Sequence, residues 1–124
     1  MATVTGPDFI ALQVRDLEAA AAFYEDRLGL RRAPSSPPGA VVFATRPVAF
    51  AVREPLPGVD LAAVSPRPGV GVALWLGADD AQGLHDDLAA AGVPVVAAPV
   101  DGPFGRMFTF LDPDGYAVTV HDAA

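Results

Sequence analysis

The chain has 124 residues, and 52% of them are hydrophobic, which suits a single domain with a real core. It has no cysteine, and all eight basic residues are arginines, which excludes disulfides, thiolate metal ligands and Schiff-base chemistry on a lysine. The net charge of −7 argues against a nucleic-acid partner, because phosphate binding requires a basic face. Without a signal-peptide pattern or an apolar stretch long enough for a bilayer, we expect a cytoplasmic protein with no membrane partner.

The first half of the sequence predicts a strand, a helix and three further strands. Residues 9–14 alternate as a strand, with Phe9, Ala11 and Gln13 on the face that does not carry the large aliphatic side chains. Asp16 is placed to cap a helix that ends at Gly29. The further strands are expected at residues 30–32, 40–44 and 48–53.

A proline-rich segment divides the chain. Residues 54–68 contain four prolines and show no helical or strand periodicity, which is typical of a linker or a flap.

The pattern of the first half then begins again. Residues 70–76 predict a strand, followed by a helix capped at Asp79 or Asp80 and ending at Gly92. Strands at 93–100, 106–111 and 116–121 follow, the last two forming a hairpin. The turn between them is Asp-Pro-Asp-Gly, in which the first aspartate can bond its own backbone and the glycine supplies a left-handed conformation.

Internal duplication is the strongest organisational feature of the sequence. The helix-ending glycines lie 63 residues apart (92 − 29 = 63), and Asp16 and Asp79 have the same separation (79 − 16 = 63). We therefore expect one domain of the α+β class built from two tandem βαβββ modules, at residues 8–54 and 69–122, joined by a linker at 55–68. Two such half-sheets would form a half-open β-barrel with a concave face.

This repeat, with the motifs of each half, closely resembles the vicinal oxygen chelate superfamily, which includes glyoxalase I, the bleomycin-resistance proteins and the extradiol dioxygenases. The resemblance covers nearly the whole chain and implies the fold, and it says less about activity. The matching residues are Asp16, Leu17, Ala19, Phe23, Tyr24, Leu28 and Gly29 in the first half, and Gly105, Arg106, Phe108, Phe110, Asp112, Pro113, Asp114 and Gly115 in the second.

Enzymes of this superfamily hold a divalent metal with His, Gln or Glu from the strands of both halves, and this chain departs from that pattern. The resemblance places the ligand positions at Phe9, at Phe50 or Ala51, at Ala73 or Val72, and at Thr119. None of these side chains supplies the imidazole or carboxylate that such a cation needs. We therefore expect neither a metal nor another cofactor.

The concave face instead predicts an apolar binding surface with a few hydrogen-bonding groups. Trp75 is placed either to stack on a planar or cationic ligand or to pack in the core. Arg106 either meets an anionic group or forms a surface ion pair with Asp101, and His121 is a ligand contact, a general base or a solvated residue. His85 is expected at the half-buried edge of the second helix. The candidate ligand-binding residues are Phe9, Gln13, Phe50, Trp75, Arg106, Thr119 and His121.

Three functions follow from these observations. The first is a metal-free protein that sequesters a small aromatic or cationic ligand, as the bleomycin- and antibiotic-resistance proteins do, and the resemblance implies a homodimer. The second is a lyase, isomerase or dioxygenase of the same superfamily that uses an unrecognised metal site or a general base. The third is a regulatory or structural dimer whose concave face is filled by its own aromatic residues.

Overall fold

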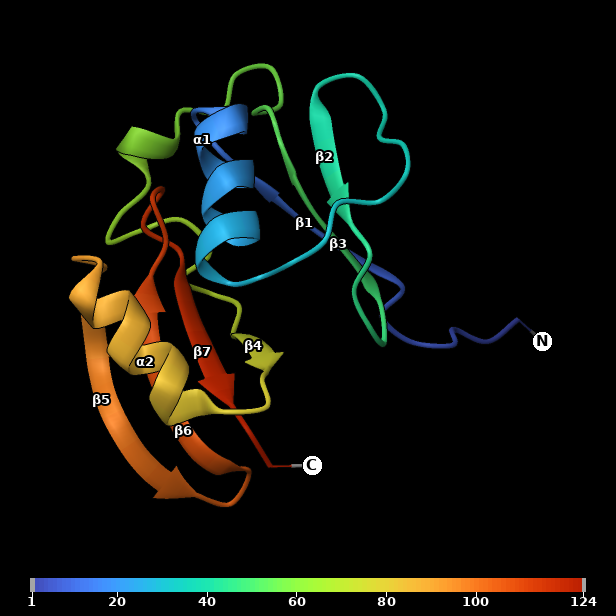
Figure 1. Cartoon of the computed structure of the whole chain (residues 1–124). Coiled ribbons are helices and arrows are strands. Elements are labelled where there is room, and N and C mark those ends of the chain that lie inside the picture. The colour runs from blue at the N-terminus through green and yellow to red at the C-terminus, as the bar shows by residue number, and fades with distance from the viewer. Residues whose placement is uncertain (1, 124) are drawn as a thin grey trace. The chain divides into compact units, whose positions relative to one another are not determined.

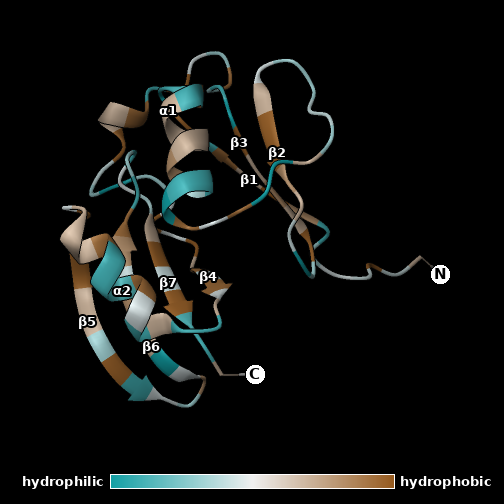
Figure 2. Ribbon diagram, in the orientation of Figure 1, coloured by the Kyte–Doolittle hydropathy of each residue, from teal (hydrophilic) through white to brown (hydrophobic). Residues whose placement is uncertain are grey.

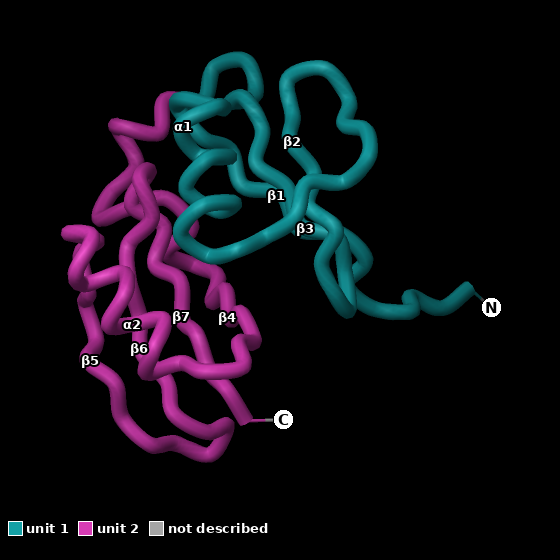
Figure 3. The backbone as a smooth tube through the Cα atoms, in the orientation of Figure 1, with its two compact units in different colours: residues 1–59 teal, residues 60–124 magenta. Residues whose placement is uncertain are grey.

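A computed structural model describes residues 2–123 of the chain. The chain divides into two compact units, residues 1–59 and residues 60–124, which Figure 3 shows in different colours. Within the described part of the chain, no helix is long and apolar enough to cross a membrane. The sequence-based module boundaries, 8–54 and 69–122, stay a prediction.

Unit 1 is a three-stranded sheet with one helical segment. The strands are β1 (Phe9–Gln13), β2 (Ala40–Phe43) and β3 (Ala49–Arg53). Their order is β1-β3-β2, with β1 parallel and β2 antiparallel to the central β3. Helix α1 (Leu17–Ala22) continues into a π-helical turn, Phe23–Arg27.

The expected cap of α1 is confirmed. The spacing between the two helix caps differs by one residue from the expected 63, and the π turn explains this difference. The carboxylate of Asp16 accepts a hydrogen bond from the backbone N–H of Ala19 at 3.1 Å. In α2 (Ala81–Ala90), however, the capping residue is Asp80 and not Asp79, because Asp80 accepts from the N–H of Gly83 at 2.9 Å. The caps are thus 64 residues apart (80 − 16 = 64). The first helical segment contains one more residue than the second, and a wide π turn accommodates such an extra residue.

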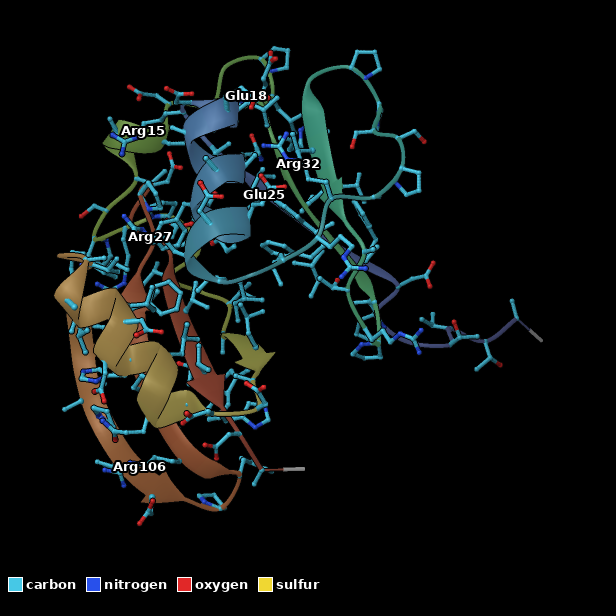
Figure 4. All side chains as sticks on the ribbon, viewed as in Figure 1. Arg15, Glu18, Glu25, Arg27, Arg32 and Arg106 are labelled. Atoms are coloured by element: carbon cyan, nitrogen blue, oxygen red, sulfur yellow. The ribbon has the colours of Figure 1, made fainter. Side chains whose placement is uncertain are left out.

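The strand expected at residues 30–32 is reduced to a single bridge, in which Arg32 pairs with Phe43. The side chain of Arg32 turns back to the helical segment, where its nitrogens lie 3.6 Å from a carboxylate oxygen of Glu18 and 3.3 Å from one of Glu25 (Figure 4). These exposed ion pairs contribute little to stability, but they are consistent with the early departure of this segment from the sheet.

The core of unit 1 is aromatic. The rings of Tyr24, Phe43 and Phe50 lie against one another, with centroids 5.1–6.3 Å apart. All three side chains are buried. Because Ile10 is the strand partner of Phe50, both residues belong to the sheet face that α1 covers.

Unit 2 is a four-stranded sheet with α2 across one face (Figure 1). Its strands are β4 (Leu74–Gly77), β5 (Val95–Gly102), β6 (Gly105–Leu111) and β7 (Ala117–His121), in the order β4-β7-β6-β5. The core of this unit contains Leu88 from α2, together with Phe108 and Phe110 from β6 and Val118 and Val120 from β7. In Figure 2 the ribbon of β7 is mostly brown, whereas α2 has teal and white stretches as well as brown ones. The alternation along β6 and β7 thus directs one face of the sheet to the core.

The strand expected at residues 70–76 begins later than the sequence indicates. The N–H of Val72 donates to the carbonyl of Gly69 at 2.9 Å, which forms a turn before β4 starts at Leu74. Ala73, expected on the concave face of a strand, therefore lies outside β4.

The final hairpin is confirmed, with β6 antiparallel to β7. The carboxylate of Asp112 accepts hydrogen bonds from the N–H groups of Asp114 and Tyr116, both at 2.9 Å. Gly115 has φ 92°, a left-handed conformation that favours glycine. The turn chemistry predicted from the sequence therefore fixes the register of β7 and the direction of each of its side chains.

Candidate ligand-binding surface

One face of the unit 2 sheet lies opposite α2 and carries most of the chemically useful side chains. On β7, Val118 and Val120 enter the core, so Thr119 and His121 lie on the other face. The parallel register pairs Trp75 of β4 with Thr119, and the antiparallel register pairs Thr109 of β6 with the same residue. The sheet thus brings three of the predicted binding residues together: Trp75, Thr119 and His121.

Three rings meet at one end of this face, and we call Trp75, Phe104 and His121 the aromatic cluster. The centroid of Trp75 lies 5.9 Å from that of Phe104 and 5.6 Å from that of His121, at interplanar angles of 84° and 61°. Phe104 and His121 are 6.2 Å apart at 69°. Such edge-to-face contacts are favourable for aromatic rings. Trp75 nevertheless remains 41% exposed and Phe104 53% exposed, so much ring surface is open to another molecule.

Hydrogen bonds hold the cluster in place. The carbonyl of Phe104 accepts from the N–H of Ala123 at 3.1 Å and lies 3.3 Å from Nδ1 of His121. A carbonyl can only accept, so Nδ1 of His121 carries a proton in this contact. In the neutral ring, Nε2 then keeps a lone pair that can accept a hydrogen bond or a proton.

A pair of hydroxyl groups lies beside the cluster. Oγ1 of Thr109 and Oγ1 of Thr119 are 2.8 Å apart, and either oxygen can donate. The hydroxyl that donates retains its acceptor lone pairs, and the other retains its proton for a further bond. The surface therefore combines aromatic area with a few hydrogen-bonding groups, the composition of many small-molecule sites.

The three predicted residues of unit 1 have different environments. Phe9 lies on the sheet face opposite α1 and is 52% exposed. The amide oxygen of Gln13 accepts a hydrogen bond from the N–H of Leu56 at 2.8 Å, which fastens the start of the proline-rich segment. Phe50 corrects our expectation, because its ring packs against Tyr24 and Phe43 and is only 3% exposed. Its register beside Ile10 turns it to the helix side, and we do not include it in the candidate surface.

Arg106 also lies away from the aromatic cluster. Arg106 is labelled in Figure 4. Its Nε donates to Oε1 of Gln82 on α2 at 2.7 Å, and its Nη1 donates to Oδ1 of Asp101 at 2.9 Å. The ion pair with Asp101 was one of the two interpretations from the sequence. Arg106 therefore belongs to the helix side of the sheet, and we do not include it in the binding surface.

His85 takes the half-buried position expected at the edge of α2. Its ring lies 5.4 Å from that of Phe108 at 80°, and Nδ1 is 2.9 Å from Oδ1 of Asp86. Hydrogen bonds from His85 and from Gln82 lower the pKa of the Asp86 carboxyl. These contacts place His85 on the helix side of the sheet, away from the aromatic cluster.

The residues present do not fit the metal of the superfamily enzymes. The positions of the usual ligands hold phenylalanine, alanine, valine and threonine, and the Thr119 hydroxyl already bonds Thr109. Among residues 2–123, no three His, Asp or Glu side chains gather in a way that could hold an ion. We therefore derive no chemical step through a metal at these positions.

Sequence reasoning missed Phe104. It lies in the two-residue connection between β5 and β6, which the sequence presents only as a turn of proline, glycine and aspartate. The alternation of a strand predicts where side chains point, but a turn has no such period. The signal available was a large aromatic residue in an otherwise small and polar loop.

Comparison with known proteins identifies the family. Residues 6–120 match the family model described as the Glyoxalase/Bleomycin resistance protein/Dioxygenase superfamily. The chain belongs to this superfamily. Its fold is therefore α+β, with two βαβββ modules that form open sheets. No curated protein is similar enough to the chain to count as a match.

The chain is similar to solved structures of proteins with different described roles. A lactoylglutathione lyase from Agrobacterium tumefaciens is 26% identical, with a TM-score of 0.68 over 98% of this chain and 96% of that one. TnmS3, an antibiotic-binding protein from Streptomyces sp. CB03234, is 22% identical, with a TM-score of 0.75 over the full length of both chains. A glyoxalase/bleomycin resistance protein from the same Streptomyces strain is 24% identical, with a TM-score of 0.72 over 94% of this chain and 99% of that one. These likenesses support the fold and leave the function to the residues of the site.

Proposed function

We propose that this chain is a metal-free protein that binds a small aromatic or cationic molecule and sequesters it, acting as a homodimer in the cytoplasm. The observation that carries the proposal is the aromatic cluster, whose two largest rings are about half exposed on the open face of the unit 2 sheet. Exposed aromatic area beside the Thr109 and Thr119 hydroxyls suits a planar ligand with a polar group. The positions of the usual metal ligands lack suitable donors, which favours binding over metal-dependent catalysis.

The likeness to an antibiotic-binding protein agrees with this proposal at the level of the fold. We propose Trp75, Phe104, Thr119 and His121 as the ligand contacts. Phe9 and Gln13 of unit 1 stay predictions from the sequence, and Phe9 is 52% exposed.

We expect Trp75→Ala to weaken binding of planar aromatic compounds at least about fivefold, because stacking on an aromatic side chain contributes about 1–3 kcal/mol for a nucleobase-sized ring. The measurement is isothermal titration calorimetry of the dialysed protein against a panel of bicyclic and tricyclic aromatic compounds. For the unaltered protein, a ligand at about 100 times its Kd should raise the free energy of unfolding by about 2.7 kcal/mol.

The matched control is Val96→Ala, which shortens an exposed side chain on the edge strand β5. This variant should bind as the unaltered protein does. If the Trp75→Ala variant binds every compound with the same affinity as the unaltered protein, the proposed site is wrong.

An enzyme is the second candidate, and His121 is the observation that favours it. Its proton on Nδ1 leaves Nε2 of the neutral ring available as a general base. The similarity to a lactoylglutathione lyase, at 26% identity, is consistent with this role. Turnover of a bound compound that His121→Gln abolishes, with binding retained, would replace the binding proposal by the enzymatic one. Stoichiometric metal in the purified protein, with turnover lost on chelation, would do the same.

A further inference from the structure

The net negative charge of the protein comes from one of its two units. Residues 1–59 contain six acidic residues and six arginines, so their formal charges cancel. Residues 60–124 contain nine acidic residues and only two arginines, Arg67 and Arg106, and so carry the whole net charge of −7. Unit 2, which carries the aromatic cluster, is therefore the acidic unit.

Neither arginine of unit 2 neutralises the surface near the cluster. Arg106 lies on the helix side of the sheet and is paired with Asp101. The Cβ atom of Arg67 lies near Gly115, at the end of β7 remote from His121. The extended strand β7, from Ala117 to His121, alone spans about 13 Å, which exceeds the Debye length of about 8 Å at physiological ionic strength.

Acidic residues, by contrast, follow the cluster directly along the chain. The N–H of Ala78 donates to the carbonyl of His121 at 2.9 Å, which fixes the chain beside the cluster just before Asp79. Asp79 is exposed. Asp122 is the residue after His121, and its two carboxylate oxygens accept from the N–H groups of Ala81 and Arg106. Asp79 and Asp122 therefore place carboxylates on the two chain segments that adjoin the cluster.

We infer that the ligand of this surface is a planar organic cation, an aromatic ring system with a delocalised positive charge. This inference rests on the proposed function and specifies its ligand class. The faces of tryptophan and phenylalanine rings attract a cation through their quadrupoles, and tryptophan does so best. The carboxylates of unit 2 add a longer-range attraction that favours a cation over a neutral ring of the same shape. An anionic ring of that shape meets repulsion from the same groups.

The test compares three bicyclic probes that differ mainly in charge: N-methylquinolinium, quinoline and naphthalene-2-sulfonate. Each is titrated calorimetrically into the full chain at about pH 8, where quinoline and an ordinary imidazole are neutral. We expect N-methylquinolinium to bind about tenfold more tightly than quinoline at about 20 mM salt, and naphthalene-2-sulfonate to bind most weakly. At about 300 mM salt the preference for the cation should fall to a few-fold, because screening removes the longer-range part and leaves the ring contact.

Two variants test the origin of the preference. Trp75→Ala should reduce the affinity for N-methylquinolinium at least fivefold. Asp79→Asn should lower it about twofold at low salt, whereas Asp87→Asn, the same change on the exposed part of α2, should have a smaller effect. Circular dichroism spectra of all variants check that they fold.

The outcomes separate this inference from the proposed function. Two results would overturn the cation preference: equal affinity for the three probes, or the highest affinity for the sulfonate. If that binding is lost in the Trp75→Ala variant, the proposed binding site is still supported. Binding of all probes that is unaffected by Trp75→Ala would overturn both, as would the absence of binding.

Discussion

Replacing Phe50 by alanine should lower the free energy of unfolding by about 3–5 kcal/mol, the usual cost of removing a fully buried phenylalanine ring. The ring of Phe50 packs against those of Tyr24 and Phe43, so its loss leaves a cavity in the core of unit 1. Urea-induced unfolding followed by far-ultraviolet circular dichroism measures this change. Because small domains are stable by only about 5–15 kcal/mol, the variant is expected near its unfolding threshold.

Phe9→Ala is the matched control, since it makes the same chemical change on the opposite face of the same sheet. With 52% of the residue exposed, its loss should cost less than about 1.5 kcal/mol. Equal losses for the two variants would contradict the placement of Phe50 in the core. A weaker ligand affinity in the Phe50→Ala variant, with full stability, would restore it as a binding residue.

Asp122→Ala should destabilise the chain by about 2–4 kcal/mol, because two partly buried N–H groups lose their acceptor. One oxygen of Asp122 accepts from the N–H of Ala81, the first residue of α2, and the other accepts from the N–H of Arg106, each at 3.0 Å. The carboxylate also lies at the positive end of the helix dipole. Thermal and urea unfolding of the variant measure the loss.

The loss of stability for Asp122→Asn should be smaller than that for Asp122→Ala. The amide oxygen of asparagine can accept from only one of the two N–H groups, and its NH₂ group then faces the other donor. Asp87→Ala, on the exposed part of α2, removes a similar charge and should change stability by less than about 0.5 kcal/mol. A loss for Asp122→Ala no larger than that for Asp87→Ala would show that the two hydrogen bonds do not contribute.

The elements that the sequence predicts best are those whose signal is local. The Asp-Pro-Asp-Gly turn, the alternation along β6 and β7, and the cap at Asp16 each depend on a few neighbouring residues, and the structure confirms them. The bridge at Arg32 and the late start of β4 at Leu74 were missed. In both places turns at the strand ends overrode a hydrophobic run that reads as a strand in the sequence.

The proposed binding surface was predictable only where strand alternation applies. Alternation correctly placed Trp75, Thr119 and His121 on one face, because a side chain on a regular strand has only two directions. The face of Phe50 depended on its pairing with Ile10, and the partner of Arg106 on α2 depended on packing across the sheet. Both features depend on residues far apart in the sequence, so no single stretch of sequence predicts them. Phe104 reaches the surface from a turn, where no periodic rule exists.

Trp75 is the sole tryptophan of the chain, and it lies on the surface that we assign to the ligand. The tryptophan fluorescence of the protein therefore originates at that surface. Any compound that shields the indole from water shifts or quenches the emission without a label or a second protein. The molecule thus carries its own optical reporter, which makes a screen of natural-product extracts a direct route to the physiological ligand.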